Sequence, residues 1–229
     1  RANRRLGIEL GLFAAEDCEV IRAGVRLARL QGLIDDGTVR ARLGIPKGVP
    51  VVIQIGNFKP QKGPLDFVRV AARVAGVRPD VHFVMLGEGP LRLEAEALAT
   101  SLGISRCMRF PGWWDDVPGL LATTAVSVLT SRHEGLPCSV VESLAAGVPM
   151  VATAVDGTVE VVRPGENGFL APSGDVRALA EGVMALVSDP ERRRRFARAA
   201  REGRDEFDRD LMVRKQEELY RWVGSTIRL

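Results

Sequence analysis

A strand, a loop and a helix follow one another in the stretch from residue 51 to residue 75, VVIQIGNFKPQKGPLDFVRVAARVA. The apolar run Val51–Ile55 is typical of a strand that is buried on both faces. Leu65, Val68 and Ala72 then recur at the spacing of one helix face, which predicts that a helix follows the strand. This β-loop-α unit is the repeating element of parallel sheets.

The same unit recurs along the chain. The predicted strands are 51–55, 82–86, 108–110, 126–129 and 149–153, and the predicted helices between them are 64–75, 91–102, 117–122 and 138–146. This alternation predicts an α/β fold, a Rossmann-like doubly wound parallel sheet with helices on both faces. Ligands of such sheets bind at the carboxyl ends of the strands, so the loops that follow the strands carry the candidate sites.

The two ends of the chain differ from this alternation. After Leu170 we expect only helices, and these are predicted over 176–187, 190–207 and 211–222. Before the first unit, residues 1–15 favour a helix and residues 18–24 a short strand that ends at a glycine. Because the first residue is Arg1, we expect the chain to be a piece of a longer protein.

The composition excludes several classes of protein. The chain has 229 residues, of which 46% are hydrophobic and 27% charged, as in ordinary globular domains. A net charge of +3 is too small to predict a nucleic-acid partner. The three cysteines form no CxxC pair, which argues against a zinc site or a disulfide framework. We find no apolar run long enough for a transmembrane segment.

The densest chemical signal is the segment Ser131–Glu142, SRHEGLPCSVVE, which lies between a predicted strand and a predicted helix. Pro137 suits a first helical turn, and the amides of that turn favour an anion. Glu134 lies in the loop and Glu142 in the helix, so the two carboxylates can meet different parts of one ligand. It is equally consistent with the spacing that Glu134 caps the helix and Glu142 is solvated. We expect Cys138 to be buried and inert.

A second signal is the loop Gly56–Gly63, GNFKPQKG, between the first strand and its helix. Its two glycines allow a close backbone approach, and the ammonium groups of Lys59 and Lys62 could neutralise a phosphate. The order of residues is not that of a P-loop. An exposed basic turn is the alternative interpretation.

Three other segments show weaker patterns. Gly87–Pro90 predicts a tight turn, because Arg92 stands where a dinucleotide fingerprint needs its third glycine. Phe110–Trp114, FPGWW, predicts either an apolar slot for a flat base or core packing of one tryptophan. Asp208 and Asp210 have the spacing of a metal motif but lie near a helix boundary, so we expect no metal there.

Several of these segments together resemble the motifs of one enzyme family. Glu134-Gly-Leu-Pro with Glu142 resembles the Glu-x7-Glu motif of retaining group 1 (family 4) glycosyltransferases. Other segments fall in the family's order, namely Val20–Val25, Lys62–Gly63, Gly87–Pro90, Phe110–Gly112, Ala145–Pro149 and Gly165–Gly168. The resemblance extends from about residue 18 to the end of the chain.

The resemblance implies a GT-B fold of two Rossmann-like domains, of which this chain is the C-terminal, donor-binding one. Residues 1–17 would then be a remnant of the preceding domain or a linker. Residues 18–210 would bind the nucleotide sugar, and 211–229 would form a helix that packs on the missing N-terminal domain. That domain would hold an unknown acceptor, so we expect the fragment alone to be inactive.

The family's functional residues transfer to matching positions here. Glu134 and Lys62 are implied to be catalytic, Glu134 facing the transferred sugar and Lys62 neutralising the diphosphate. Glu142 is implied to hold the ribose hydroxyls. The remaining donor-binding residues implied by the resemblance are Gly56, Asn57, Lys59, Gly135 and Leu136, with Arg109, Phe110 and Gly112 near the base.

The sequence departs from the family at two positions. Asn57 stands where an Arg usually reaches the diphosphate, and Ala125 where an Asp is common. We expect Lys59 to supply the charge that Asn57 lacks.

The resemblance thus predicts a cytoplasmic hexosyltransferase that uses a nucleoside-diphosphate sugar and needs no metal or other cofactor. Any contact with the inner face of a membrane would be made through the missing domain. Two alternatives stay open, a GT-B-fold sugar-nucleotide epimerase and a non-catalytic nucleotide-sugar-binding module. The epimerase is disfavoured because no epimerase acid-base pair is recognisable beside Glu134-Gly-Leu-Pro.

Overall fold

A six-stranded sheet forms the centre of the computed structural model, which describes residues 2–226. The strands are β1 (Val51–Ile55), β2 (His82–Leu86), β3 (Met108–Gly112), β4 (Val126–Leu129), β5 (Met150–Thr153) and β6 (Gly168–Ala171). They lie in the order β3-β2-β1-β4-β5-β6, and every neighbouring pair is parallel. The predicted α/β, Rossmann-like fold is therefore confirmed.

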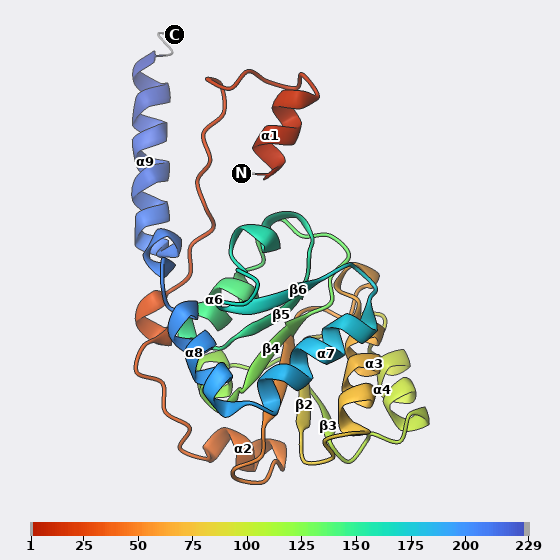
Figure 1. Ribbon diagram of the computed structural model, residues 1–229. Coiled ribbons are helices and arrows are strands. Elements are labelled where there is room, and N and C mark those ends of the chain that lie inside the picture. Colours follow the sequence, from red (N-terminus) through yellow and green to blue (C-terminus); the bar gives the residue numbers. More distant parts are fainter. Residues whose placement is uncertain (1, 227–229) are drawn as a thin grey trace.

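Helices cover both faces of this sheet (Figure 1). One layer contains α3 (Pro64–Ala75), α4 (Arg92–Ser101) and α7 (Val176–Val187), and the other contains α5 (Val117–Thr123) and α6 (Cys138–Ala146). Within β1, Val51 and Ile53 pack into the core under α6, whereas Val52 packs into the core under α3. The continuous apolar pattern of the strand follows from burial on both of its faces.

The strand order reverses between β1 and β4, which are neighbours in the sheet. Two loops leave the carboxyl ends of these strands, residues 56–63 after β1 and residues 130–137 after β4. In doubly wound sheets the crevice at this reversal is the usual place for a ligand. Both segments that the sequence singled out therefore border the same crevice.

Several predictions about the secondary structure were wrong, among them the first helix, which was expected over residues 1–15 and ends at Glu9. Residues 168–171 form β6, which pairs with β5, whereas no strand was predicted there. Residues 18–24 form no strand. The residue that follows them, Val25, forms an isolated β-bridge with Asp208. The helix expected over 190–207 ends as α8 (Pro190–Ala200), because Gly203 turns the chain with a φ of +72° before a short 3-10 turn.

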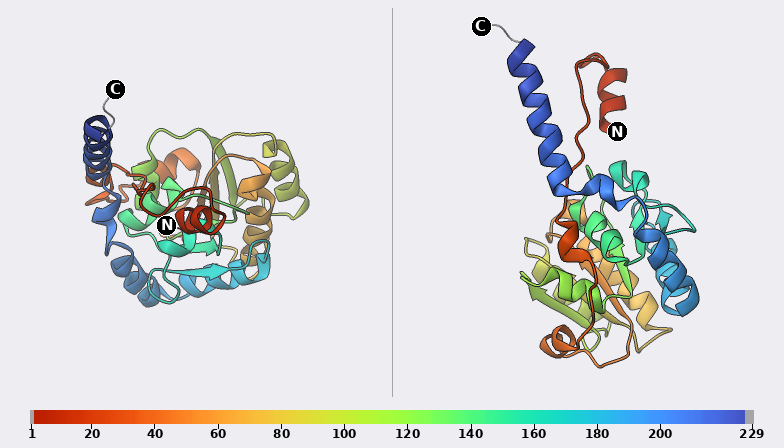
Figure 2. Two further views of the ribbon diagram at one scale, coloured as in Figure 1. Left: turned by 90° about the horizontal axis from the view of Figure 1, so that it is seen from above. Right: turned by 90° about the vertical axis from the view of Figure 1, so that its left-hand side faces the viewer.

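The terminal helices are α1 (Ala2–Glu9) and α9 (Arg209–Thr226). Asp208 Oδ1 accepts hydrogen bonds from the amides of Asp210 at 2.8 Å and Leu211 at 3.2 Å, so its carboxylate caps the start of α9. Both helices project beyond the sheet on the same side (Figures 1 and 2). Residue 1 of the predicted first helix and residues 227–229 of the predicted last segment lie outside the described residues.

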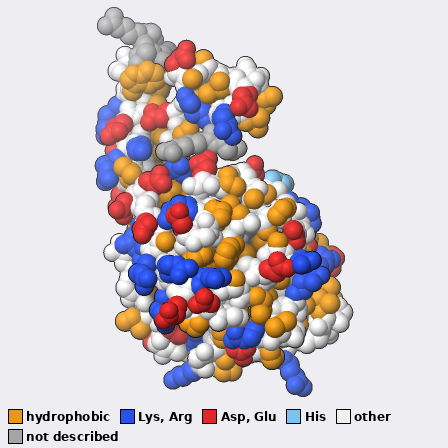
Figure 3. Space-filling view, viewed as in Figure 1, with side chains coloured by type: hydrophobic (Ala, Val, Ile, Leu, Met, Phe, Trp, Pro, Cys, Tyr) orange, Lys and Arg blue, Asp and Glu red, His pale blue; other side chains and the backbone are white. Residues whose placement is uncertain are grey.

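The remaining elements are the helix α2 (Thr38–Leu43) and the 3-10 turns η1 (Leu27–Leu30), η2 (Pro60–Lys62), η3 (Asp156–Glu160) and η4 (Arg204–Phe207). Lys and Arg side chains are interspersed with Asp and Glu on the face shown in Figure 3, as the small net charge leads one to expect. Within residues 2–226, no helix combines the length and hydropathy that crossing a bilayer requires.

Candidate functional site

The loops after β1 and β4 are joined to each other at the crevice. The amide of Arg132 donates to Gln61 O at 2.7 Å, and Gln61 Nε2 donates to His133 O at 3.0 Å. Gly63 has a φ of +59°, and a Cβ there would lie 2.3 Å from Thr130 O. A side chain at position 63 would therefore clash with the backbone that follows β4, and only glycine fits there.

Two buried polar side chains form hydrogen bonds that hold the loop of residues 56–63 on the sheet. Gln54 and Thr130 are each 1% exposed. Gln54 Nε2 donates to Lys62 O at 3.1 Å, and Thr130 Oγ1 lies 2.9 Å from Gln54 Oε1 and from Lys62 O. Sequence reasoning missed both residues. The one available signal was a glutamine inside the otherwise apolar strand β1, because a buried amide needs partners that hold it in place.

Lys62 and Glu134 meet in the crevice. Lys62 Nζ lies 2.5 Å from Glu134 Oε1, and the side chains are 20% and 6% exposed. Ser131 Oγ donates to the same carboxylate oxygen at 2.6 Å. Glu134 is thus a buried carboxylate held by a cation and a hydroxyl rather than a cap on the amides of α6. The structure brings together the two residues that were expected to be catalytic.

Glu142 lies on α6 and lines a cavity of about 400 Å³ with Arg29, Val117 and Cys138. Burial raises the pKa of the Glu142 carboxyl, and the positive charge of Arg29 offsets part of that rise. Glu142 is therefore partly buried at the edge of this cavity, whereas the alternative interpretation made it a solvated helix residue.

Cys138 is exposed, so its predicted burial was wrong. It is the first residue of α6, where the side chain lies at the cavity rather than under the helix. Loss of surrounding water raises the pKa of the Cys138 thiol, and the carboxylate of Glu142 raises it further. The thiol is consequently accessible but mainly protonated at neutral pH.

A second, mainly apolar cavity of about 180 Å³ lies where β1, β2 and β3 end. Its lining includes Asn57, Trp113 and Trp114. Trp113 is 78% exposed, whereas Trp114 is half-buried and packs against the core. Val117 lines this cavity as well as that of Glu142, so the two adjoin. Gly56 and Gly112 also line the apolar cavity.

Other expected site residues lie elsewhere. Arg109 donates to the carbonyl oxygens of Leu43 at 2.9 Å and Arg106 at 2.9 Å, so its guanidinium ties α2 to the sheet instead of reaching the crevice. The Phe110 ring packs on Phe58 with 6.0 Å between ring centroids.

The remaining expected residues lie in the two loops, and of their side chains that of Leu136 packs against the core. Lys59 is exposed, and its ammonium makes no ion pair within residues 2–226. Gly135 and Leu136 line a cavity of about 480 Å³ together with residues of the N-terminal segment, among them Phe13 and Val20.

The arrangement has the parts needed to bind a phosphorylated ligand that carries hydroxyl groups and a flat ring. Lys62 can neutralise a phosphate, and a carboxylate such as Glu142 can accept hydrogen bonds from two hydroxyls. An aromatic-lined slot beside it suits a planar ring. A nucleotide combines these three features.

Comparison with known proteins agrees with this chemistry. Residues 35–203 match the family model described as "Glycosyl transferases group 1". A lipopolysaccharide core biosynthesis glycosyltransferase of Rhizobium meliloti is 37% identical over 163 residues, which are 71% of this chain and 47% of that protein. The N-acetyl-alpha-D-glucosaminyl L-malate synthase of Bacillus anthracis is 30% identical over 80% of this chain and 48% of that protein.

A solved structure has a similar fold with a bound nucleotide sugar. The Anabaena protein HepE in complex with UDP-glucose superposes with a TM-score of 0.86 and 25% identity, over 96% of this chain and 61% of that one. The chain spans about half the length of the curated relatives that it matches.

Proposed function

The chain belongs to the group 1 glycosyltransferases, and from this premise we propose that it is the donor-binding part of a retaining enzyme that transfers a hexose from a nucleoside-diphosphate sugar. The observation that carries the proposal is the buried ion pair of Lys62 and Glu134, which joins the loops after β1 and β4. The two adjoining cavities are lined in part by residues of the first of these loops and of the helix that follows β4. The acceptor site would lie on a further domain, since the curated relatives are about twice as long. This chain would then bind the donor without transferring its sugar.

The geometry supports one order of contacts along the donor. The base enters the slot beside Trp113 and Trp114, and the ribose hydroxyls reach Glu142. The diphosphate meets Lys62 and the sugar meets Glu134. The complex of HepE with UDP-glucose supports the choice of a nucleotide sugar as the ligand.

Lys62 has the role of stabilising the leaving group in this proposal. When the bond between the sugar and the phosphate breaks, its electron pair goes to the departing diphosphate, and a cation placed there lowers the barrier. Without donor, Lys62 is neutralised by Glu134. The diphosphate therefore competes with Glu134 for the same ammonium group, and no metal ion is required as the counter-charge.

The first prediction tests this counter-charge. We expect the purified chain to bind uridine, guanosine or adenosine diphosphate in the presence of a chelator, because Lys62 can neutralise the phosphates. Isothermal titration calorimetry with each diphosphate measures it. Binding that appears only when magnesium or manganese is added would show that the metal-free site is wrong, and the absence of binding by all three would contradict the proposed function.

A second prediction concerns Lys59, which lies exposed on the same loop as Lys62. We expect Lys59→Ala and Lys62→Ala each to weaken nucleoside-diphosphate binding at least about tenfold, roughly 1.4 kcal/mol, because Asn57 supplies no charge. Lys47→Ala is the matched control, since Lys47 is also an exposed lysine but precedes β1. A loss confined to Lys62→Ala would mean that one lysine holds the diphosphate.

A further inference from the structure

Asp156 has an unusual backbone conformation beside the crevice. Its φ is +39°, and among the described residues it is the one residue other than glycine with a positive φ. It opens η3, the turn that follows β5. Aspartate visits the left-handed region at some energetic cost, so interactions in the surrounding structure must hold it there.

Those interactions are with the backbone of the Glu134 loop. Asp156 Oδ2 accepts a hydrogen bond from the amide of Glu134 at 2.7 Å. The amide of Gly157 donates to Gly135 O at 2.9 Å, and a Cβ on Gly157 would lie 2.0 Å from that oxygen. Residues 156 and 157 therefore hold the peptide group that precedes Glu134 and the one that follows Gly135, and a side chain at position 157 would not fit between the two segments.

Glu134 is consequently fixed from two directions. Lys62 and Ser131 hold its carboxylate, and Asp156 holds its amide. When a donor diphosphate takes Lys62, one of the contacts that orient the carboxylate is lost. The bond from Asp156 to the backbone does not depend on Lys62, so it keeps Glu134 in place while the ion pair is broken.

We propose that Asp156 is a positioning residue that holds Glu134 against the sugar of the donor. This inference rests on the proposed function, in which Glu134 faces that sugar. Asp156 acts through Glu134 and contributes to recognition of the sugar, whereas the nucleotide is held by Lys62 and Glu142. Its loss therefore weakens binding of the sugar nucleotide and leaves binding of the nucleoside diphosphate unchanged.

Two substitutions of Asp156 distinguish the positioning of Glu134 from a contribution to the stability of the fold. Asp156→Gly removes the carboxylate and also relieves the backbone strain, so the fold is retained. Asp156→Asn keeps an oxygen that can accept the amide hydrogen bond and tolerates a positive φ. Asp189→Gly is the matched control, because the Asp189 carboxylate caps α8 by accepting from the amide of Arg192 at 2.9 Å, away from the crevice.

The experiment measures affinities for UDP and UDP-glucose by calorimetry, and amide hydrogen exchange of the peptide that contains Glu134 and Gly135. For Asp156→Gly we expect faster exchange and about tenfold weaker binding of UDP-glucose, with binding of UDP changed less than about twofold. Asp156→Asn should restore both properties, and Asp189→Gly should alter neither.

The two proposals fail in different ways. Unchanged exchange at Glu134 in Asp156→Gly, or equal losses for UDP and UDP-glucose, would overturn the positioning role and leave the proposed function standing. If the unaltered chain binds neither compound nor any other nucleoside diphosphate, the proposed function fails. Hydrogen exchange alone then decides whether Asp156 holds Glu134.

Discussion

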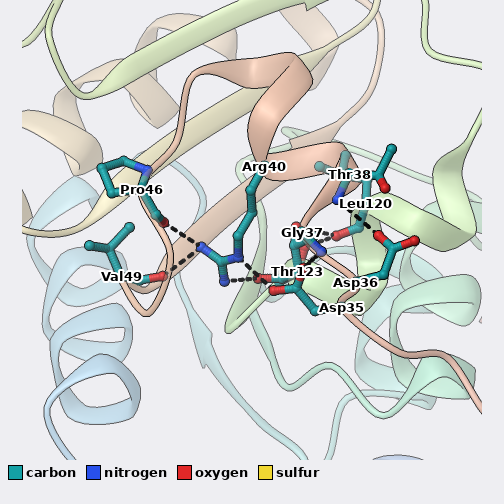
Figure 4. Close-up of polar contacts among 10 residues, drawn as sticks. Asp35, Asp36, Gly37, Thr38, Arg40, Pro46, Val49, Leu120 and Thr123 are labelled. Carbon is teal, nitrogen blue, oxygen red and sulfur yellow. Dashed lines mark hydrogen bonds and ion pairs between the residues drawn. The ribbon is translucent and has the colours of Figure 1, made fainter.

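Replacement of Arg40 by alanine is expected to lower the free energy of unfolding by about 3 kcal/mol, the low end of the cost of breaking a buried ion pair. The Arg40 side chain is 10% exposed, and its Nε lies 2.5 Å from Asp35 Oδ2. Figure 4 shows the guanidinium surrounded by its acceptors. Asp35 is partly exposed and can regain water when Arg40 is removed, which is why the low end applies.

Three carbonyl groups, of which that of Thr123 is buried, add to the cost of breaking the ion pair. Arg40 donates to Pro46 O at 3.2 Å, Val49 O at 3.0 Å and Thr123 O at 3.1 Å. Val49 precedes β1 and Thr123 precedes β4, so one side chain joins the amino ends of both central strands to α2. Alanine leaves these acceptors without their partner, and each buried carbonyl that loses a hydrogen bond destabilises the fold.

Urea unfolding followed by circular dichroism measures the effect, and Arg42→Ala is the matched control. Arg42 lies on the same helix but is about half exposed, with Asp115 3.4 Å away and the centre of the Trp114 ring 4.0 Å from its guanidinium carbon, so its removal should cost about 1 kcal/mol. Because Arg40 lies at the amino ends of the strands, nucleotide affinity of the folded variant should be unchanged. Similar losses for both arginines would contradict the role assigned to Arg40.

The sequence predicted the sheet well where strands are long and apolar. β1 and β2 were located with their observed bounds, because burial on both faces requires continuous hydrophobic residues. The pairing of Lys62 with Glu134 could also be anticipated, since loops after parallel strands meet at one edge. The predicted roles of these two residues remain proposals.

Residues whose role depends on tertiary contacts were not found in the sequence. Arg40 lies in a short helix that has one further arginine, and nothing local distinguishes it from that residue, the half-exposed Arg42. Asp156 is bonded to Glu134, 22 positions away, and its φ cannot be inferred from its neighbours. Arg109 was expected near the base, but its carbonyl partners at Leu43 come from a distant segment.

The second large effect is expected at Glu142, which we propose contacts two ribose hydroxyls. Hydrogen bonds to a charged acceptor contribute about 1.5–3 kcal/mol each, so Glu142→Ala should weaken nucleoside-diphosphate binding by about 100-fold or more. Calorimetry with the diphosphate that binds the unaltered chain measures the change. If the variant bound the diphosphate as tightly as the unaltered chain does, Glu142 would not contact the ribose hydroxyls.

Glu142→Gln tests the same residue through its charge. Burial raises the pKa of Glu142 in the folded chain, so folding favours the protonated carboxyl. Stability is therefore lost as the pH rises from the ordinary carboxyl pKa through the raised value. Glutamine cannot ionise, so at neutral pH this variant should unfold at a slightly higher temperature than the unaltered chain.

The affinity for the nucleotide should rise with pH, whereas the stability of the fold falls. The ionised carboxylate is the better acceptor for hydroxyl groups, so affinity should increase as the pH rises through the raised pKa of Glu142. A nucleoside without phosphates isolates this change from titration of the phosphates, and Glu142→Gln should remove it. A residue that gives up stability when it ionises and gains ligand binding in the same step is suited to binding rather than to support of the fold. If Glu142→Gln lowered stability and affinity together, Glu142 would instead be a structural residue of α6.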